Sequence, residues 1–189
     1  SSKVHFSVPH EPTQSEFILN QSNLENSSEV QSKFNLVGQV FKPENSGFIH
    51  TATMKLGTSG NNCAGFHTRL YKWLGDMDSS PESSRGTLLA EADQTNICNN
   101  TAYPTWKDFT WNFTGENQVL LSNSSYYYLE LDYDGRTYLA SWQVPDVHWY
   151  GSPNGSLIDG KIWAYQSTWQ SPQANSGALD LYLVIGGEI

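Results

Sequence analysis

Aromatic side chains that stand next to polar ones are the residues of this chain best suited to chemistry, and that chemistry is sugar recognition. The chain contains seven Trp and ten Tyr. An aromatic ring stacks on the apolar C–H face of a pyranose, while amides, carboxylates and imidazoles bond its hydroxyls. The candidate carbohydrate-binding residues are Trp149 and Tyr150 with Asp146 and His148, Trp169 with Gln170, Trp163, Tyr126 and Tyr128. The alternative is that Trp149 and Trp169 only cover the ends of a hydrophobic core.

Two further patterns bear on catalysis. Glu130 and Asp132 lie two residues apart on a predicted strand, so they share a face at about 7 Å, which is within the range of inverting glycosidases. A solvated strand face shows the same spacing. His148 and Tyr150 are the one sequence-close pair of a His and a Tyr that could serve a polysaccharide-cleaving enzyme. The chain contains no nucleophile-elbow or metal-hydrolase motif. We therefore predict no catalytic residue.

The chain has two cysteines, Cys63 and Cys98, and each lies beside asparagines next to a predicted strand. A disulfide between them would close a loop of about 35 residues and add roughly 3–4 kcal/mol to stability. The alternative is two unrelated free thiols. Charged residues make up only 15% of the chain, and a composition so rich in Asn, Ser, Thr and aromatics is typical of secreted all-β proteins. We therefore predict an extracellular protein with a disulfide.

The net charge of the chain excludes several classes of partner. It is −9 at neutral pH, whereas binding to nucleic acid requires clustered Lys and Arg. The same charge argues against anionic membrane surfaces. No apolar run approaches the length of a membrane-spanning helix. We therefore predict neither nucleic-acid binding nor membrane insertion.

Residues 126–144 predict a single β-hairpin that positions several of the candidates. The turn is Asp134 followed by Gly135, because this dipeptide accommodates the positive φ angles of a type I′ turn. Folding the chain there separates two faces. Tyr127, Leu129 and Leu131 fall on a core-like face with Trp142, whereas Tyr126, Tyr128, Glu130 and Asp132 fall on a polar one.

The remaining chain predicts about ten strands separated by turn-rich loops, with no convincing helical period. The other predicted strands are residues 15–20, 34–42, 47–56, 66–73, 87–93, 106–113, 160–166 and 178–185. The long predicted loops are residues 75–86, 145–155 and 167–177. This pattern predicts an all-β antiparallel sandwich or barrel. We expect residues 1–32 to be a lead-in with a possible first strand, and residues 33–189 to be one domain.

The order of the strand sequences resembles a known group of domains. The order runs through Gln39 to Phe41, GFIHTATMKL, RLYK, GTLLA, WxxFxWxF, YYxLEL and LDLYLVIGG. It resembles jelly-roll β-sandwich domains of secreted or surface-anchored prokaryotic and phage proteins, which are similar in architecture to carbohydrate-binding modules. The resemblance covers roughly residues 33–187. It implies a non-catalytic extracellular module that binds a polysaccharide or glycan and is attached to other domains of a larger secreted protein.

The same resemblance implies a cofactor. Carbohydrate-binding jelly-rolls often hold a structural calcium ion between their first and last strands, which makes Asp180 a candidate ligand that Glu16 could join. Asp180 is the lone acid in the apolar run ALDLYLVI, so it must face outward or be paired. The alternative is a charge that protects an edge strand from aggregation.

Two other functions fit the sequence. One is a structural or assembly domain of a surface, filament or virion protein, in which residues 1–32 pair with a sheet edge of a neighbour. The other is a polysaccharide-cleaving enzyme on the same scaffold, which requires two convergent carboxylates or a Tyr/His pair in a groove. Fold alone does not decide among them.

Overall fold

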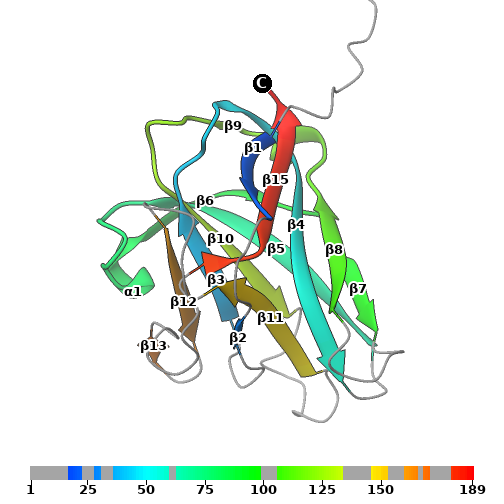
Figure 1. The fold of residues 1–189 in the computed structure, drawn as a ribbon. Coiled ribbons are helices and arrows are strands. Elements are labelled where there is room, and N and C mark those ends of the chain that lie inside the picture. The colour runs from blue at the N-terminus through cyan, green and yellow to red at the C-terminus, as the bar shows by residue number, and fades with distance from the viewer. Residues whose placement is uncertain are drawn as a thin grey trace, which may run out of the picture.

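The protein is an antiparallel β-sandwich, which confirms the predicted fold class. The computed structural model describes residues 17–22, 28–30, 36–59, 63–98, 106–133, 146–152, 160–165, 168–170 and 180–189. Within these residues the chain forms fifteen strands arranged in two sheets (Figure 1). The predicted number of about ten strands was too low, mainly because several of the strands have only two to four residues.

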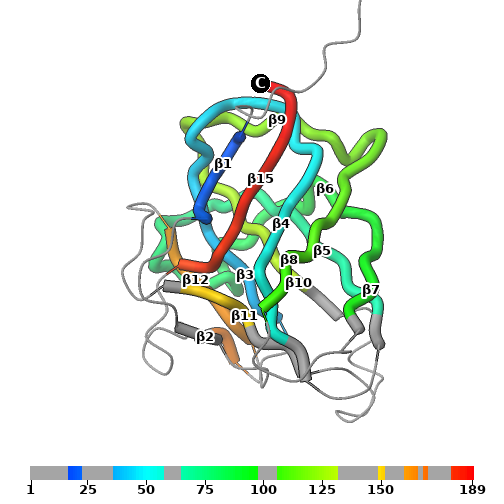
Figure 2. Tube along the Cα trace, turned by 45° about the vertical axis from the view of Figure 1, so that its right-hand side comes forward, coloured from blue at the N-terminus to red at the C-terminus, as the bar shows by residue number. Residues whose placement is uncertain are grey.

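The first sheet has eight strands. They are β1 (Phe17–Gln21), β2 (Ser28–Val30), β4 (Gly47–Ser59), β8 (Trp106–Asn112), β9 (Leu120–Leu121), β11 (Asp146–Ser152), β14 (Asp180–Leu181) and β15 (Leu183–Glu188). Their order is β1-β15-β4-β11-β14, with β8 and β9 also paired to β4 and β2 paired to β11. Figure 2 shows β1, β15, β4 and β8 side by side. The possible first strand is thus present as β1 and pairs with the last strand.

The second sheet has seven strands. They are β3 (Leu36–Phe41), β5 (Cys63–Trp73), β6 (Arg85–Glu91), β7 (Thr95–Cys98), β10 (Tyr127–Tyr133), β12 (Lys161–Tyr165) and β13 (Trp169–Gln170). Their order is β13-β12-β3-β10-β5-β6, and β7 pairs with β5. All pairings in both sheets are antiparallel.

The core lies between the sheets and follows the predicted alternation. Tyr127, Leu129 and Leu131 of β10 are buried in it, as the face assignment predicted. Trp111 of β8 is fully buried, and its indole N–H donates a hydrogen bond across the sandwich to the carbonyl oxygen of Phe66 on β5, at 3.1 Å. A buried indole needs such a partner, so this bond fixes one sheet over the other.

The predicted hairpin is wrong. Both edges of β10 are occupied, one by β3 and the other by β5, over almost its whole length. A strand with two neighbours has no free edge for the segment that follows it. The turn signal at Asp134 and Gly135 is local, and the long-range pairings of β10 override it. Residues 134–145, including Trp142, lie outside the described residues.

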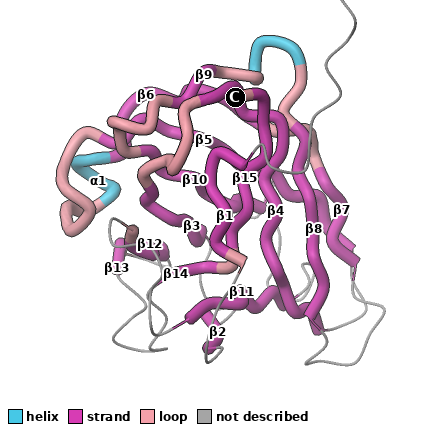
Figure 3. The backbone as a smooth tube through the Cα atoms, turned by 45° about the horizontal axis from the view of Figure 1, so that its top comes forward, coloured by secondary structure: helices cyan, strands magenta, loops and turns pink. Residues whose placement is uncertain are grey.

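The predicted loop over residues 145–155 is also wrong in its described part. Residues Asp146–Ser152 form β11, which pairs with β4, β2 and β14. The predicted loop at residues 75–86 contains one helical turn, α1 (Pro81–Ser84), and a short 3-10 helix, η1 (Gly115–Asn117), follows β8. Both are drawn in cyan in Figure 3. Neither described helix has the length and apolar character to cross a membrane.

Strand pairing places the two cysteines opposite each other. Cys63 of β5 and Cys98 of β7 are direct partners in the antiparallel register. Such partners have Cα atoms about 4.5–5.5 Å apart, a span that a disulfide bridges. The side chains of both lie outside the described part of the chain, so the bond stays a prediction.

We expect a non-reduced proteolytic digest to contain a peptide pair linked through Cys63 and Cys98, identified by mass spectrometry. Replacing both residues with serine is expected to lower the free energy of unfolding by about 3 kcal/mol, because the unfolded chain gains loop entropy. Titration of two free thiols in denaturant, without reductant, would contradict the prediction.

Candidate functional site

The outer face of the seven-stranded sheet carries a second apolar cluster, separate from the core. Val40, Trp73, Tyr128 and Trp163 are buried there, with Tyr71, Met77, Tyr126 and Trp169 packed against them. We call these eight residues the outer layer. On β10, Tyr128 lies between two core residues and therefore points the other way. The predicted polar face is thus largely covered, and Tyr128 and Glu130 on it are buried.

The segment between β5 and β6 folds back over the outer layer. The indole N–H of Trp73 donates to the Asp76 carbonyl at 2.8 Å, and that of Trp163 donates to the Met77 carbonyl at 3.1 Å. Lys161 forms an ion pair with Asp78 at 2.7 Å. These contacts use the polar edges of Trp73 and Trp163, so both residues hold the segment in place.

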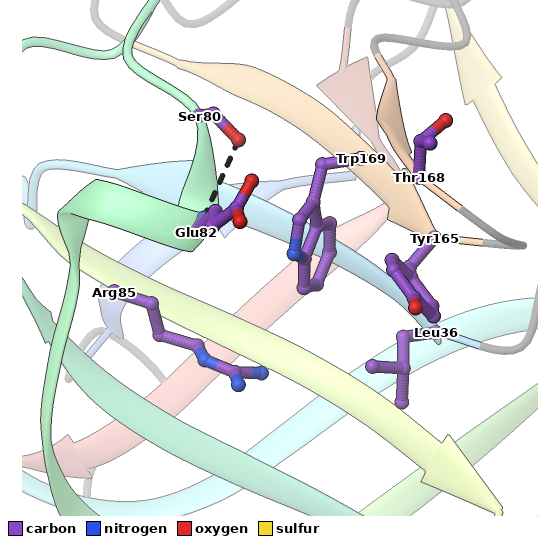
Figure 4. A pocket seen from close by; sticks show the side chains of 7 residues that line it. All are labelled: Leu36, Ser80, Glu82, Arg85, Tyr165, Thr168 and Trp169. Atoms are coloured by element: carbon purple, nitrogen blue, oxygen red, sulfur yellow. Dashed lines mark hydrogen bonds between the residues drawn. The ribbon is translucent and has the colours of Figure 1, made fainter.

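A pocket of about 560 Å³ opens beside this segment. Its lining residues are Leu36, Ser80, Glu82, Arg85, Tyr165, Thr168 and Trp169. Figure 4 shows the Trp169 ring between Glu82 on one side and Tyr165 on the other, with Arg85 and Leu36 below. Aromatic rings and hydrogen-bonding groups thus face one cavity.

The two rings of the pocket support each other. The centroids of Tyr165 and Trp169 are 5.1 Å apart, and Trp169 also makes an edge contact with Tyr128 at 6.4 Å. Tyr165 and Trp169 are register partners across β12 and β13. Both rings are half-buried. The strand pair therefore fixes the rings and leaves part of each ring available to a ligand.

Arg85 is held between charge and aromatic rings. Its Nη1 donates to both carboxylate oxygens of Glu130, at 3.2 and 3.0 Å, and Glu130 is only 1% exposed. The guanidinium carbon lies 4.8 Å from the Tyr71 ring centroid and 5.5 Å from that of Trp169. Arg85 therefore joins the outer layer to the pocket wall with a fixed geometry.

The same groups set the protonation states at this face. Burial acts to lower the pKa of Arg85. The Glu130 carboxylate and Tyr71 act to raise it, and their combined effect is the larger, so the net shift of this pKa is upward. Burial, and then the charge of Glu130, raise the pKa of Tyr128 well above its ordinary value, while Arg85 opposes this. At neutral pH the site thus contains a charged guanidinium and a neutral tyrosine hydroxyl.

The sequence-predicted sugar-binding residues divide between the two sheets. Trp163, Tyr126, Tyr128, Trp169 and Gln170 belong to or adjoin strands of the seven-stranded sheet, and Trp169 lines the pocket. Asp146, His148, Trp149 and Tyr150 lie on β11 in the other sheet. The side chains of Asp146, His148 and Gln170 are outside the described part of the chain. The structure therefore brings five of the nine predicted residues to one sheet, and of these Trp169 lines the pocket.

Of the two candidate tryptophans Trp149 and Trp169, Trp149 is buried and cannot contact a sugar. Its side chain is 1% exposed and belongs to the core. The reason is that residues 146–152 form a strand, which turns this side chain toward the opposite sheet. Tyr150 points the other way, where its ring contacts Trp106 at 5.1 Å and the ammonium of Lys55 at 5.5 Å. This cluster lies on the outer face of the eight-stranded sheet, away from the pocket.

Several pocket residues were missed by sequence reasoning. Tyr165 shares a strand face with Trp163, so alternation alone could have added it. Ser80 followed by Pro81 is a helix-start signal, and the Ser80 hydroxyl does accept a hydrogen bond from the Glu82 N–H at 3.3 Å. No local signal links Arg85 to Glu130, because they lie 45 residues apart on strands that are not paired with each other.

Asp180 is buried between the sheets and paired. It is 1% exposed, and the Gln39 side-chain amide donates to its carboxylate at 3.0 Å. Gln39 in turn accepts a hydrogen bond from the Leu181 N–H at 2.9 Å. Burial rules out the solvent-facing edge charge. Glu16 lies outside the described residues, and among those described no three His, Cys, Asp or Glu form a metal-binding group. The calcium ion stays a prediction.

Gly38 of β3 leaves the space that the Tyr128 ring of the outer layer occupies. An added methyl group there would run into the Tyr128 ring and would lie 2.6 Å from the Leu129 carbonyl oxygen. Real Cβ atoms do not approach so closely, so β3 and β10 would have to separate.

We therefore expect Gly38→Ala to lower the free energy of unfolding by about 3 kcal/mol, measured by urea denaturation. The comparison is Gly57→Ala, whose methyl would meet the Trp106 ring at 3.2 Å and should cost less. Equal stability of Gly38→Ala and the unsubstituted protein would show that the close packing over β3 is not required.

Comparison of the chain with protein-family models, with curated proteins and with solved structures finds no match. The geometry of the pocket and its supporting layer is therefore the basis for inferring the function of the protein.

Proposed function

We propose that this protein is a non-catalytic glycan-binding domain whose site is the pocket beside α1 and β13. The observation that carries the proposal is the combination of a half-buried Tyr165 and Trp169 pair with Arg85 and Glu82 around one cavity of about 560 Å³. The volume is that of a small-ligand site. The rings offer a stacking surface to the C–H face of a sugar, and Arg85 and Glu82 offer a donor and an acceptor to its hydroxyls.

The carboxylates favour binding without cleavage. Hydrolysis of a glycosidic bond needs two carboxyl groups facing the bond. Glu82 lines the pocket, whereas the Glu130 carboxylate is buried and held by Arg85. Of the described acids, Glu82 alone is among the lining residues. The side chain of Asp132, the other member of the predicted pair, lies outside the described part of the chain.

The strand order supports a jelly-roll version of the sandwich. The strands β1, β15, β4 and β8 of one sheet and β3, β10, β5 and β6 of the other alternate between sheets along the chain for much of its length. This arrangement agrees with two interlocked Greek keys. Together with the composition, it supports an extracellular module that works within a larger secreted protein.

Native affinity electrophoresis tests the proposal. The protein is run through gels that contain one soluble polysaccharide each, taken from plant, algal and bacterial sources. We expect at least one polymer to retard the protein, and the Trp169→Ala variant to migrate as in a polymer-free gel. Trp106→Ala, on the opposite sheet, should be retarded like the unsubstituted protein. Absence of retardation by every polymer, or equal retardation of Trp169→Ala, would refute the proposed site.

A further inference from the structure

The charges around the pocket do not balance. Arg85 is matched by Glu130, and Lys161 is matched by Asp78. Glu82 lines the same pocket, is exposed, and forms no ion pair within the described part of the chain. The pocket wall therefore presents one carboxylate whose charge is not compensated, on a chain whose net charge is already −9.

The position of Glu82 is fixed by its own helical turn. The Ser80 hydroxyl caps the Glu82 N–H, and Pro81 begins α1. The turn is tied to the end of β5 by a hydrogen bond from the Leu74 N–H to the Ser84 carbonyl at 2.8 Å. The carboxylate lies on one side of the Trp169 ring (Figure 4). A ligand stacked on this ring would therefore lie beside Glu82.

Both charged groups of the wall can bond a hydroxyl, but together they do not suit a carboxylate. A sugar hydroxyl donates to the Glu82 carboxylate and accepts from an Arg85 N–H. A carboxylate on the ligand would face Glu82, and the attraction of Arg85 for it is already offset by Glu130. The wall thus favours uncharged hydroxylated rings over carboxylated ones.

We infer that the pocket takes uncharged glycans and rejects glycans that carry carboxylates, and that Glu82 sets this selectivity. The inference rests on the proposed glycan binding and deepens it. Glu82 acts by repulsion, which is a common source of specificity. Because a charge near the surface is screened by salt, the selectivity falls as ionic strength rises.

Matched polymer pairs test the inference. The probes are hydroxyethylcellulose against carboxymethylcellulose, dextran against carboxymethyl-dextran, and methyl-esterified pectin against polygalacturonate, each in affinity gels at low salt. For every pair whose neutral member retards the protein, we expect binding to the carboxylated member to be at least about 10-fold weaker. The Glu82→Gln variant should narrow this ratio to about 3-fold or less, and so should about 0.5 M NaCl with the unsubstituted protein.

The matched control is Glu116→Gln, which removes one charge from the exposed 3-10 helix η1, away from α1 (Figure 3). It should leave the ratio unchanged, because only the charge at the pocket is expected to matter. Equal binding of both members of a pair by the unsubstituted protein would overturn the inference while glycan binding stands. A ratio of neutral to carboxylated binding that Glu82→Gln does not change would overturn the inference as well. Absence of binding to every polymer would instead overturn the proposed function itself.

Discussion

Replacing Trp169 with alanine is expected to weaken glycan binding about 30-fold, which corresponds to about 2 kcal/mol. Trp169 is the largest ring that lines the pocket, and its neighbours Tyr165 and Tyr128 hold it in place. Alanine removes the stacking surface but leaves Arg85 and Glu82 where they are. Isothermal titration calorimetry, with an oligosaccharide of the polymer that retards the protein most strongly, measures the loss.

Trp106→Ala is a closely matched control for this substitution. Trp106 is also a half-buried strand tryptophan, with a tyrosine ring at 5.1 Å, but it lies on the outer face of the other sheet. Both variants should lose similar stability, and only Trp169→Ala should lose affinity. Trp169→Phe should recover most of the binding, because a ring is restored. Similar affinities for the two alanine variants would place the stacking surface elsewhere.

Replacing Arg85 with alanine is expected to lower the free energy of unfolding by about 3 kcal/mol. The Glu130 carboxylate is buried and would lose both hydrogen bonds from Nη1. The guanidinium contacts with Tyr71 and Trp169 would be lost as well. Because 32% of the Arg85 side chain is exposed, solvent screens part of the interaction, and the expected cost is at the lower end of the range for buried pairs. Urea denaturation measures the change in the free energy of unfolding.

A double-mutant cycle with Glu130→Gln separates the ion pair from the packing. The double variant should be less destabilised than the sum of the two single changes, because it no longer buries a carboxylate beside the missing guanidinium. Arg85→Lys should recover only part of the loss, since an ammonium group neither bonds both oxygens in a fixed plane nor stacks on the rings. A loss below about 1 kcal/mol for Arg85→Ala would show that the pair behaves as an ordinary surface pair.

Alternation of side chains made the core the most predictable part of this molecule. It placed Leu129 and Leu131 inside correctly, because a strand that faces a core on one side must alternate. It did not reveal that the reverse face of β10 is also covered, because the covering segment belongs to another part of the chain. Burial of Tyr128 and Glu130 is therefore a tertiary property that the local pattern does not encode.

The errors arose where a local signal competed with a distant partner. Asp134 and Gly135 favour a hairpin, yet β10 pairs with β3 and β5, which come much earlier in the chain. Turn-forming residues on either side of Trp149 suggested a loop, yet β4 supplies a strand partner and buries the ring. Of the candidate site, the sequence indicated Trp169 but not Arg85, because the contact of Arg85 with Glu130 depends on the folded sheet.

The place of β15 between β1 and β4 has a consequence for how this domain folds during synthesis. β15 follows all the other described strands in sequence, yet it is an inner strand of its sheet, so that sheet stays incomplete until β15 has left the ribosome. Until then β1 and β4 each present an unpaired edge with core residues such as Ile18 and Met54 beside it. Unpaired edges of this kind promote aggregation. The nascent chain therefore passes through an aggregation-prone state that ends only when β15 is inserted.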